Sequence, residues 1–290
     1  MYKLIVTDLD GTLLNSHGEV SKTNIDTIKL AISKGVEVIL ASGRPVEAMR
    51  NYALEIGASK YIISGNGAII YNLEKNKIVY KKQIKKTRVE QIAKACEENS
   101  IFYCVYTKDK ILTKSLDYSL LFFYAENTRK PQEKQTRIEV IPNLLEYIRE
   151  HSNEEYFKIS IFDKDRSVFG SIMRKLKKVK NVDILQVEHM STKLVKLEDK
   201  EIKLEYFYTE ITAKNINKWT ALKFLLRRFR IRKKNVIAIG DNFNDKEMLE
   251  KCGMGVVMGN STPNMRMIGK LLTSSNDDDG VAKAVKKLVL

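Results

Sequence analysis

The sequence predicts an α/β fold: a Rossmann-like, doubly wound parallel sheet interrupted by an inserted α+β module. In the first and the last eighty residues, short apolar strands alternate with amphipathic helices, which is typical of a parallel sheet covered on both faces. Between residues 84 and 209 the pattern is typical of a mostly antiparallel sheet with helices. We therefore expect one α/β core formed by residues 1–83 and 210–290, with residues 84–209 inserted into it.

Apolar runs and turn signals place the elements of the N-terminal part. Ser21 is suited to cap a helix whose apolar residues recur at helical spacing up to Gly35. The further elements, in order, are strands at 2–7 and 36–41, a helix from Pro45 to Gly57, a strand at 61–63, and a hairpin of 68–71 and 78–80.

The insert and the C-terminal part follow from the same signals. In the insert we expect helices at 88–99, 144–151 and 168–179 and strands at 102–107, 110–113, 157–162, 182–187 and 194–197, with 120–137 unassigned. In the C-terminal part we expect a helix at 219–229, a strand at 236–239, a helix through Met248 and Leu249, a strand at 255–259 and a final helix at 281–288.

Length and composition are those of a globular protein. The chain has 290 residues, of which 43% are hydrophobic and 30% charged, so it is long enough for two domains. No apolar stretch is long enough to span a bilayer, and Asp8 and Asp10 interrupt the layout of a secretory signal. We expect a cytoplasmic protein with no membrane partner. The 3 cysteines show no spacing typical of zinc or redox sites.

The chain is strongly basic, with a formal net charge of +15. The strongest basic runs, 174–178 and 227–234, lie in or just after helix-like segments, where a charge run is usually a solvated face. No recognised nucleic-acid motif accompanies them, so nucleic acid is an unlikely partner. We favour attraction of small anionic substrates such as phosphate esters.

The segment Asp8-Leu9-Asp10-Gly11-Thr12 is the most informative stretch of the chain. Its two carboxylates are two residues apart at the end of a strand, and in extended backbone such residues point to the same side. Paired carboxylates repel each other and need a cation between them, which is costly for a purely structural turn. The pair is useful where one carboxylate attacks phosphorus, the other moves a proton and a metal holds both.

Two further strand ends carry unusual polar sequences. Ser42-Gly43-Arg44 follows the second strand, and Gly240-Asp241-Asn242-Phe243-Asn244-Asp245 follows a late one. In open α/β sheets, ligands bind beyond the carboxyl ends of the strands. Lys218 precedes the helix that leads into the late strand. The sequence thus predicts one polar site at this edge of the sheet.

This combination resembles the haloacid dehalogenase (HAD) superfamily of aspartate-nucleophile phosphotransferases, and within it the Cof-type phosphatases with a type IIB α/β cap. The segments that resemble its four motifs are 8–14, 41–45, Lys218 and 240–249, and Asn66-Gly67-Ala68, 257–260 and 276–282 resemble Cof-type signatures. One departure stands beside the lysine: Trp219 follows it, where the family usually has glycine.

The resemblance implies a catalytic set. Asp8 would be the nucleophile that forms an aspartyl-phosphate, and Asp10 the acid that protonates the leaving alkoxide and then activates water. Lys218 would neutralise developing charge. The implied cofactor is Mg²⁺, with the Asp8 carboxylate, the Asp10 backbone carbonyl and Asp241 as ligands. Asp245 would support Lys218 or the metal waters.

The implied phosphate- and substrate-binding residues are Thr12, Ser42, Gly43, Asn66 and Asn244. Ser42 and the Gly43 N–H would hold phosphate oxygens, and Asn244 would add an amide donor. Thr12 could also orient Asp10, and Asn66 is equally a good turn residue. For Arg44 an ion pair, at the surface or at a helix cap, is favoured over a substrate clamp.

The predicted function is Mg²⁺-dependent hydrolysis of small phosphomonoesters, sugar phosphates first, with pyridoxal phosphate and flavin mononucleotide as alternatives. The insert would act as a lid over the substrate. The alternatives are a phosphomutase, since a sugar hydroxyl and water attack the same intermediate, and a basic nucleic-acid-binding protein on a retained phosphatase fold. We expect a monomer or a homodimer.

Overall fold

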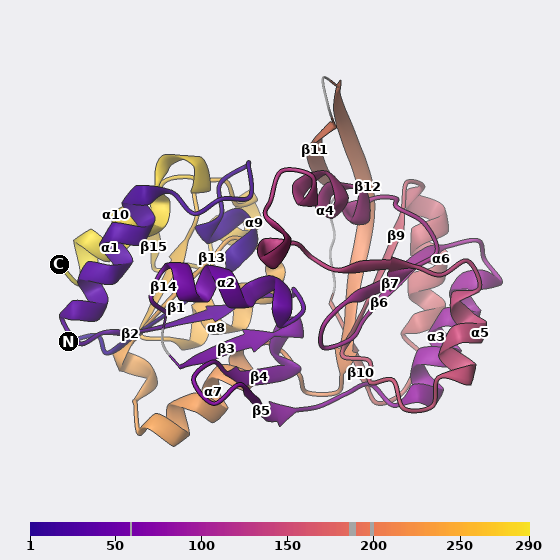
Figure 1. Cartoon of the computed structure of the whole chain (residues 1–290), viewed down its shortest axis with the longest axis horizontal. Coiled ribbons are helices and arrows are strands. Elements are labelled where there is room, and N and C mark those ends of the chain that lie inside the picture. Colours follow the sequence, from indigo (N-terminus) through magenta and orange to yellow (C-terminus); the bar gives the residue numbers. More distant parts are fainter. Residues whose placement is uncertain (59, 186–189, 198–199) are drawn as a thin grey trace. The chain divides into compact units, whose positions relative to one another are not determined.

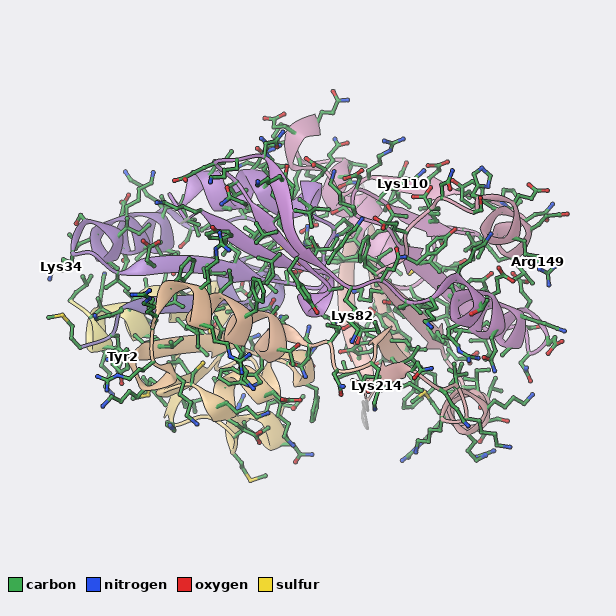
Figure 2. All side chains as sticks on the ribbon, turned by 90° about the horizontal axis from the view of Figure 1, so that it is seen from below. Tyr2, Lys34, Lys82, Lys110, Arg149 and Lys214 are labelled. Carbon is green, nitrogen blue, oxygen red and sulfur yellow. The ribbon has the colours of Figure 1, made fainter. Side chains whose placement is uncertain are left out.

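The computed structural model describes residues 1–58, 60–185, 190–197 and 200–290, which form two compact units. The first comprises Met1–Lys81 and Asn217–Leu290, and the second comprises Lys82–Ile216. Within the second unit, Lys82 Nζ donates to the Lys214 carbonyl oxygen at 2.7 Å. The segment that leaves the first unit and the segment that returns to it therefore lie side by side at this end (Figure 2).

The first unit is built on an eight-stranded sheet of order β15-β14-β13-β1-β2-β3-β4-β5 (Figure 1). The strands are β1 Leu4–Thr7, β2 Glu37–Ala41, β3 Tyr61–Ser64, β4 Ile69–Asn72, β5 Lys77–Lys81, β13 Val236–Gly240, β14 Met254–Val257 and β15 Leu271–Leu272. Neighbouring strands from β15 to β3 are parallel, and β4 and β5 add antiparallel strands at one edge. The chain extends the sheet in one direction from β1 to β3 and in the other from β13 to β15, which creates a switch point at the end of β1.

Helices cover both faces of this sheet (Figure 1). They are α1 Lys22–Ser33, α2 Glu47–Glu55, α7 Lys218–Phe229, α8 Lys246–Lys251, α9 Pro263–Arg266 and α10 Gly280–Leu288. Alternate residues of β1, such as Leu4 and Val6, pack with Leu222 of α7 and Leu249 of α8 in one buried cluster, while α1 and α10 contact each other. The predicted Ser21 cap of α1 is confirmed, since its hydroxyl accepts the Asn24 N–H at 3.1 Å.

The second unit is an α+β module. Its sheet has the order β10-β12-β9-β6-β7-β8, with β11 paired to β12, and only the β7–β8 pair is parallel. The strands are β6 Phe102–Tyr106, β7 Ile111–Thr113, β8 Ile138–Val140, β9 Lys158–Asp163, β10 Val182–Ile184, β11 Ser191–Leu197 and β12 Lys200–Ala213. The helices are α3 Lys86–Glu97, α4 Ser119–Asn127, α5 Leu144–Glu150 and α6 Arg166–Leu176.

The predicted fold class is confirmed, but the insert differs from the sequence-based expectations in several places. The expected boundary at 209/210 falls inside β12, and the first unit resumes only at Asn217. Residues 120–137 carry most of α4 and lead to β8. The expected strand at 182–187 ends at Ile184, and residues 186–187 lie outside the described residues. In the described part of the chain, no helix is both long and apolar enough to cross a membrane.

Candidate active site

The predicted site residues of the first unit meet at the carboxyl ends of its central strands. Asp8 follows β1, Ser42 follows β2 and Asp241 follows β13, while Lys218 is the first residue of α7. The Asp8 carboxyl is buried, and its Oδ1 lies 2.7 Å from Lys218 Nζ. Lys218, which is 0% exposed, also lies 2.7 Å from Asp245 Oδ1. One buried ammonium therefore joins two buried carboxylates.

Three carboxylates form a cluster that fits a divalent cation. Asp8, Asp241 and Asp245 each place one oxygen within 4.8 Å of the others. With the Lys218 ammonium, three negative charges and one positive charge leave two negative charges in a largely buried space. A divalent cation balances this surplus, and hard oxygen ligands of this kind suit Mg²⁺ and related ions.

The electrostatics of the cluster explain why a cation is needed. Burial raises the pKa of the Asp8 carboxyl well above its ordinary value, and the neighbouring carboxylates, Asp245 foremost, raise it further. The Lys218 ammonium lowers the pKa of Asp8, but by less than burial and Asp245 raise it. Burial disfavours the charged form of Lys218 itself, yet Asp245 and Asp8 more than offset this and raise its pKa above the ordinary value. Lys218 therefore stays charged, and further positive charge is needed to hold Asp8 ionised.

Backbone and hydroxyl donors orient the two late aspartates. Asp245 Oδ2 accepts the backbone N–H groups of Asp241 at 3.1 Å and Asn242 at 3.2 Å, so both oxygens of this carboxylate have protein donors. Asp245 thus contacts the Lys218 ammonium through one oxygen and the backbone after β13 through the other. The Thr12 hydroxyl, which is fully buried, donates to Asp241 Oδ1 at 2.9 Å. Thr12 thus orients a predicted metal ligand, which differs from the phosphate contact that we expected of it.

Gly11 makes room for Asp241. Its φ of +74° lies in the left-handed region, and a Cβ at this position would lie 2.6 Å from Asp241 Oδ2. Only glycine allows the turn after β1 both this conformation and this close approach.

Arg44 holds the carboxylate of Asp10. Its guanidinium is buried, Nε donates to both carboxylate oxygens at 3.1 and 2.9 Å, and Nη2 donates to Oδ1 at 2.5 Å. The ion pair favoured for Arg44 is present, but it is buried at the site and not on the surface. Sequence reasoning missed the partner, because residues 34 positions apart meet only through the pairing of β1 with β2.

The segments after β2 and β3 lie against each other. The Asn66 N–H donates to the Ser42 carbonyl oxygen at 3.0 Å, and Ser42 Oγ accepts the Arg44 N–H at 3.1 Å. Among the described residues, the Gly43 N–H has no hydrogen-bond partner, as a phosphate donor requires. Asn244 Nδ2 donates to Asn66 Oδ1 at 3.1 Å, and Asn244 Oδ1 is buried without a partner in the described part of the chain. The two asparagines therefore form one polar pair.

The late signature segments support the turn after β1. Asn260 Nδ2 donates to the Gly11 carbonyl oxygen at 2.9 Å, and Asn276 Nδ2 donates to that of Leu14 at 2.9 Å. Asp277 Oδ1 accepts the Ser16 N–H at 2.7 Å. These residues stabilise the backbone that carries Asp8 and Asp10, a role that sequence spacing alone does not reveal.

Trp219 belongs to the core. It is 9% exposed and packs in the buried cluster with residues of α7 and α8, and its ring centroid lies 5.8 Å from Lys251 Nζ. The large residue beside Lys218 therefore faces the hydrophobic core and does not displace the lysine.

Comparisons with known proteins identify the family of the chain. A family model of haloacid dehalogenase-like hydrolases matches residues 5–285. The chain belongs to this family. Among curated relatives, Phosphatase YwpJ of Bacillus subtilis is 30% identical over 292 residues, which cover 99% of this chain and 100% of the relative. The resemblance to HAD phosphatases of the Cof type is thus confirmed, as is the assignment to a phosphatase enzyme.

Two further similar proteins match nearly the whole chain. The 5-amino-6-(5-phospho-D-ribitylamino)uracil phosphatase YcsE of Bacillus subtilis is 26% identical over 288 residues, which cover 99% of this chain and 96% of the relative. A solved haloacid dehalogenase-like hydrolase from B. subtilis has a TM-score of 0.81 and 26% identity, with 99% of both chains covered.

Proposed function

We propose that this HAD phosphatase hydrolyses phosphomonoesters of small metabolites, sugar phosphates first, through an aspartyl-phosphate on Asp8, with Mg²⁺ as cofactor. The observation that carries the proposal is the buried Asp8 carboxylate at the switch point, beside the Lys218 ammonium and two further carboxylates. The name of the relative YcsE, which acts on a phosphorylated ribityl compound, supports a polyhydroxylated substrate.

In the first step, a carboxylate oxygen of Asp8 attacks phosphorus and the bond from phosphorus to the ester oxygen breaks. Asp10 gives its proton to the leaving alkoxide. In the second step, Asp10 takes a proton from water, the water oxygen attacks phosphorus, and the bond from phosphorus to Asp8 breaks. Free phosphate leaves, and both aspartates return to their starting forms.

The other residues bind and orient. The Gly43 N–H, which has no partner in the described part of the chain, and the Ser42 hydroxyl are suited to phosphate oxygens. Lys218 offsets the charge that develops on these oxygens. Arg44 fixes the position of Asp10 between the two steps. Asp8, Asp241 and the Asp10 carbonyl would hold the divalent cation, which supplies positive charge to the transferring phosphoryl group.

We assign the second unit as the lid that excludes water and selects the leaving group. Its position in the chain supports this, because residues 82–216 interrupt a unit that already contains every proposed catalytic residue. We propose in addition that the substrate is a small phosphorylated metabolite and that the protein is located in the cytoplasm.

Phosphate release from a panel of phosphorylated metabolites, with and without Mg²⁺, tests the proposal in wild type and Asp8→Asn. We expect metal-dependent turnover that Asp8→Asn lowers by about 10⁴-fold or more. Turnover that survives this substitution would overturn the mechanism. Release of free phosphate separates hydrolysis from a mutase reaction, which returns an isomeric sugar phosphate.

A further inference from the structure

A second pocket of the first unit is lined by cations. It has a volume of about 250 Å³, and its lining residues come from β3, the β4–β5 hairpin and the end of α7. Figure 1 shows where these elements lie in the first unit. Lys75 and Lys77 of the hairpin and Arg228 of α7 line it, and no lining residue is acidic. Tyr61, Ile78 and Val79 supply its apolar part.

The three cations have no partner for their charges among the residues that the structure describes. In the described part of the chain, no side-chain hydrogen bond or ion pair joins Lys75, Lys77 or Arg228 to another residue. Lys60, beside the lining residue Tyr61, differs, because it pairs with Glu74 at 3.8 Å. All three residues are exposed, and three positive charges gathered around one pocket attract an anion.

The hairpin turn that carries the lysines is held in place. Asn76, between them, has a φ of +48°, and its Oδ1 accepts from Arg50 Nη1 at 2.9 Å and from the Tyr71 hydroxyl at 2.5 Å. The Lys75 N–H donates to Oδ1 of buried Asn72 at 2.6 Å. A fixed backbone reduces the entropy lost when lysines close on a ligand.

The pocket is separate from the catalytic cluster. Tyr61 is the first residue of β3, whereas the proposed active site lies beyond the carboxyl ends of the strands. Arg228 lies ten positions after Lys218 along α7, which at a rise of 1.5 Å per residue is about 15 Å. An anion in this pocket is therefore not the substrate phosphate of the proposed reaction.

We propose that this pocket binds a small organic phosphate with at least two negative charges. The three cations at the open rim set the charge, the volume of about 250 Å³ favours a small molecule over a polymer, and the apolar part accepts a carbon skeleton. The basic run at 227–234, which the proposed catalytic function does not use, adds to the positive potential at this end of α7.

Isothermal titration calorimetry with pyrophosphate on the full chain tests the site. The variant carries Lys75→Ala, Lys77→Ala and Arg228→Ala. A matched control carries Lys22→Ala, Lys29→Ala and Lys286→Ala, which removes the same charge from exposed positions of α1 and α10. We expect the pocket variant to lose one pyrophosphate site or to bind it about tenfold or more weakly, and the control to match wild type.

The readout is the difference between variants, so pyrophosphate bound at the catalytic cluster does not affect it. Phosphate release should be unchanged in the pocket variant, because none of its residues belongs to the catalytic set. Equal weakening in both variants, or in neither, would overturn the proposal. So would binding of a single-stranded oligonucleotide through these three residues with no binding of pyrophosphate, since the partner would then be nucleic acid.

Discussion

At the scale of single residues, the contact between Arg44 and Asp10 positions the proposed acid. A proposed acid that must take and give a proton is held through both oxygens by a buried guanidinium. The contact fixes the orientation of the Asp10 carboxylate relative to Asp8. The planar guanidinium of arginine, with its several N–H donors, does this better than the single ammonium of a lysine. Positioning of this kind matters because small displacements of a reacting group cost much of the rate.

Arg44→Ala should therefore lower kcat by about 100-fold and leave KM within a few-fold of wild type. Arg44→Lys should restore part of the loss, because it returns the charge without the fork. Steady-state kinetics with phosphate release as readout, with circular dichroism as a check of folding, measures this. A raised KM at unchanged kcat would instead make Arg44 a substrate clamp.

Gly11 offers a second residue-scale prediction with a control in the same chain. Gly11 and Gly35 have φ of +74° and +82°, but only at Gly11 would a Cβ meet a neighbour, at Asp241. Each change to alanine should cost about 1–2 kcal/mol of unfolding free energy through backbone strain. Gly11→Ala should also lose activity and metal affinity, whereas Gly35→Ala should keep both. Denaturant unfolding measures the stability of both variants, and Mg²⁺ titration measures their activity and metal affinity. Equal activity of Gly11→Ala and Gly35→Ala would contradict the role given to Gly11.

At the scale of elements, prediction succeeded where a local signal was strong. The parallel strands are short apolar runs, and the polar sequences at their ends carry the candidate site. The long strand β12 was missed although Ile202, Leu204, Tyr206 and Tyr208 alternate within it, a period typical of a strand. The Arg44–Asp10 and Asn66–Asn244 pairs could not be predicted, since each joins strand ends through tertiary structure.

The N-terminus of α7 links an element to the chemistry. Asn217 caps it: its Oδ1 accepts the Thr220 N–H at 2.9 Å, and its N–H donates to Thr220 Oγ1 at 3.0 Å. The cap fixes the first turn of α7, and Lys218 is the first residue of that turn. Asn217→Ala should cost about 1 kcal/mol of stability and lower kcat, because Lys218 then moves with a frayed turn.

The matched control is Asp165→Ala, which removes the cap of α6 in the second unit, where Asp165 accepts from Ser167 N–H and Val168 N–H. Thermal unfolding and phosphate release should show a comparable loss of stability, with kcat lowered only in Asn217→Ala. An equal fall of kcat in both variants would refute the link between this cap and Lys218.

At the scale of the whole molecule, the carboxylate cluster joins the two ends of the chain. β1 pairs with β13, so Asp8 and Asp241 meet only after the insert has been traversed. Repulsion between the Asp8 and Asp241 carboxylates opposes the pairing of β1 with β13. A cation bound between the two carboxylates makes their approach favourable. Metal binding should therefore stabilise the first unit as a whole, by about 2.7 kcal/mol at a concentration of about 100 times Kd.

Thermal unfolding with EDTA and with increasing Mg²⁺ tests this in wild type, Asp241→Asn and the exposed control Asp26→Asn. Without metal, Asp241→Asn should melt above wild type, because one repelling charge is gone. With Mg²⁺ the order should reverse, because wild type gains most from the ion while the variant has lost a ligand. Asp26→Asn should follow wild type under both conditions. A fixed order of melting temperatures at all Mg²⁺ concentrations would show that Asp241 neither repels Asp8 nor binds the ion.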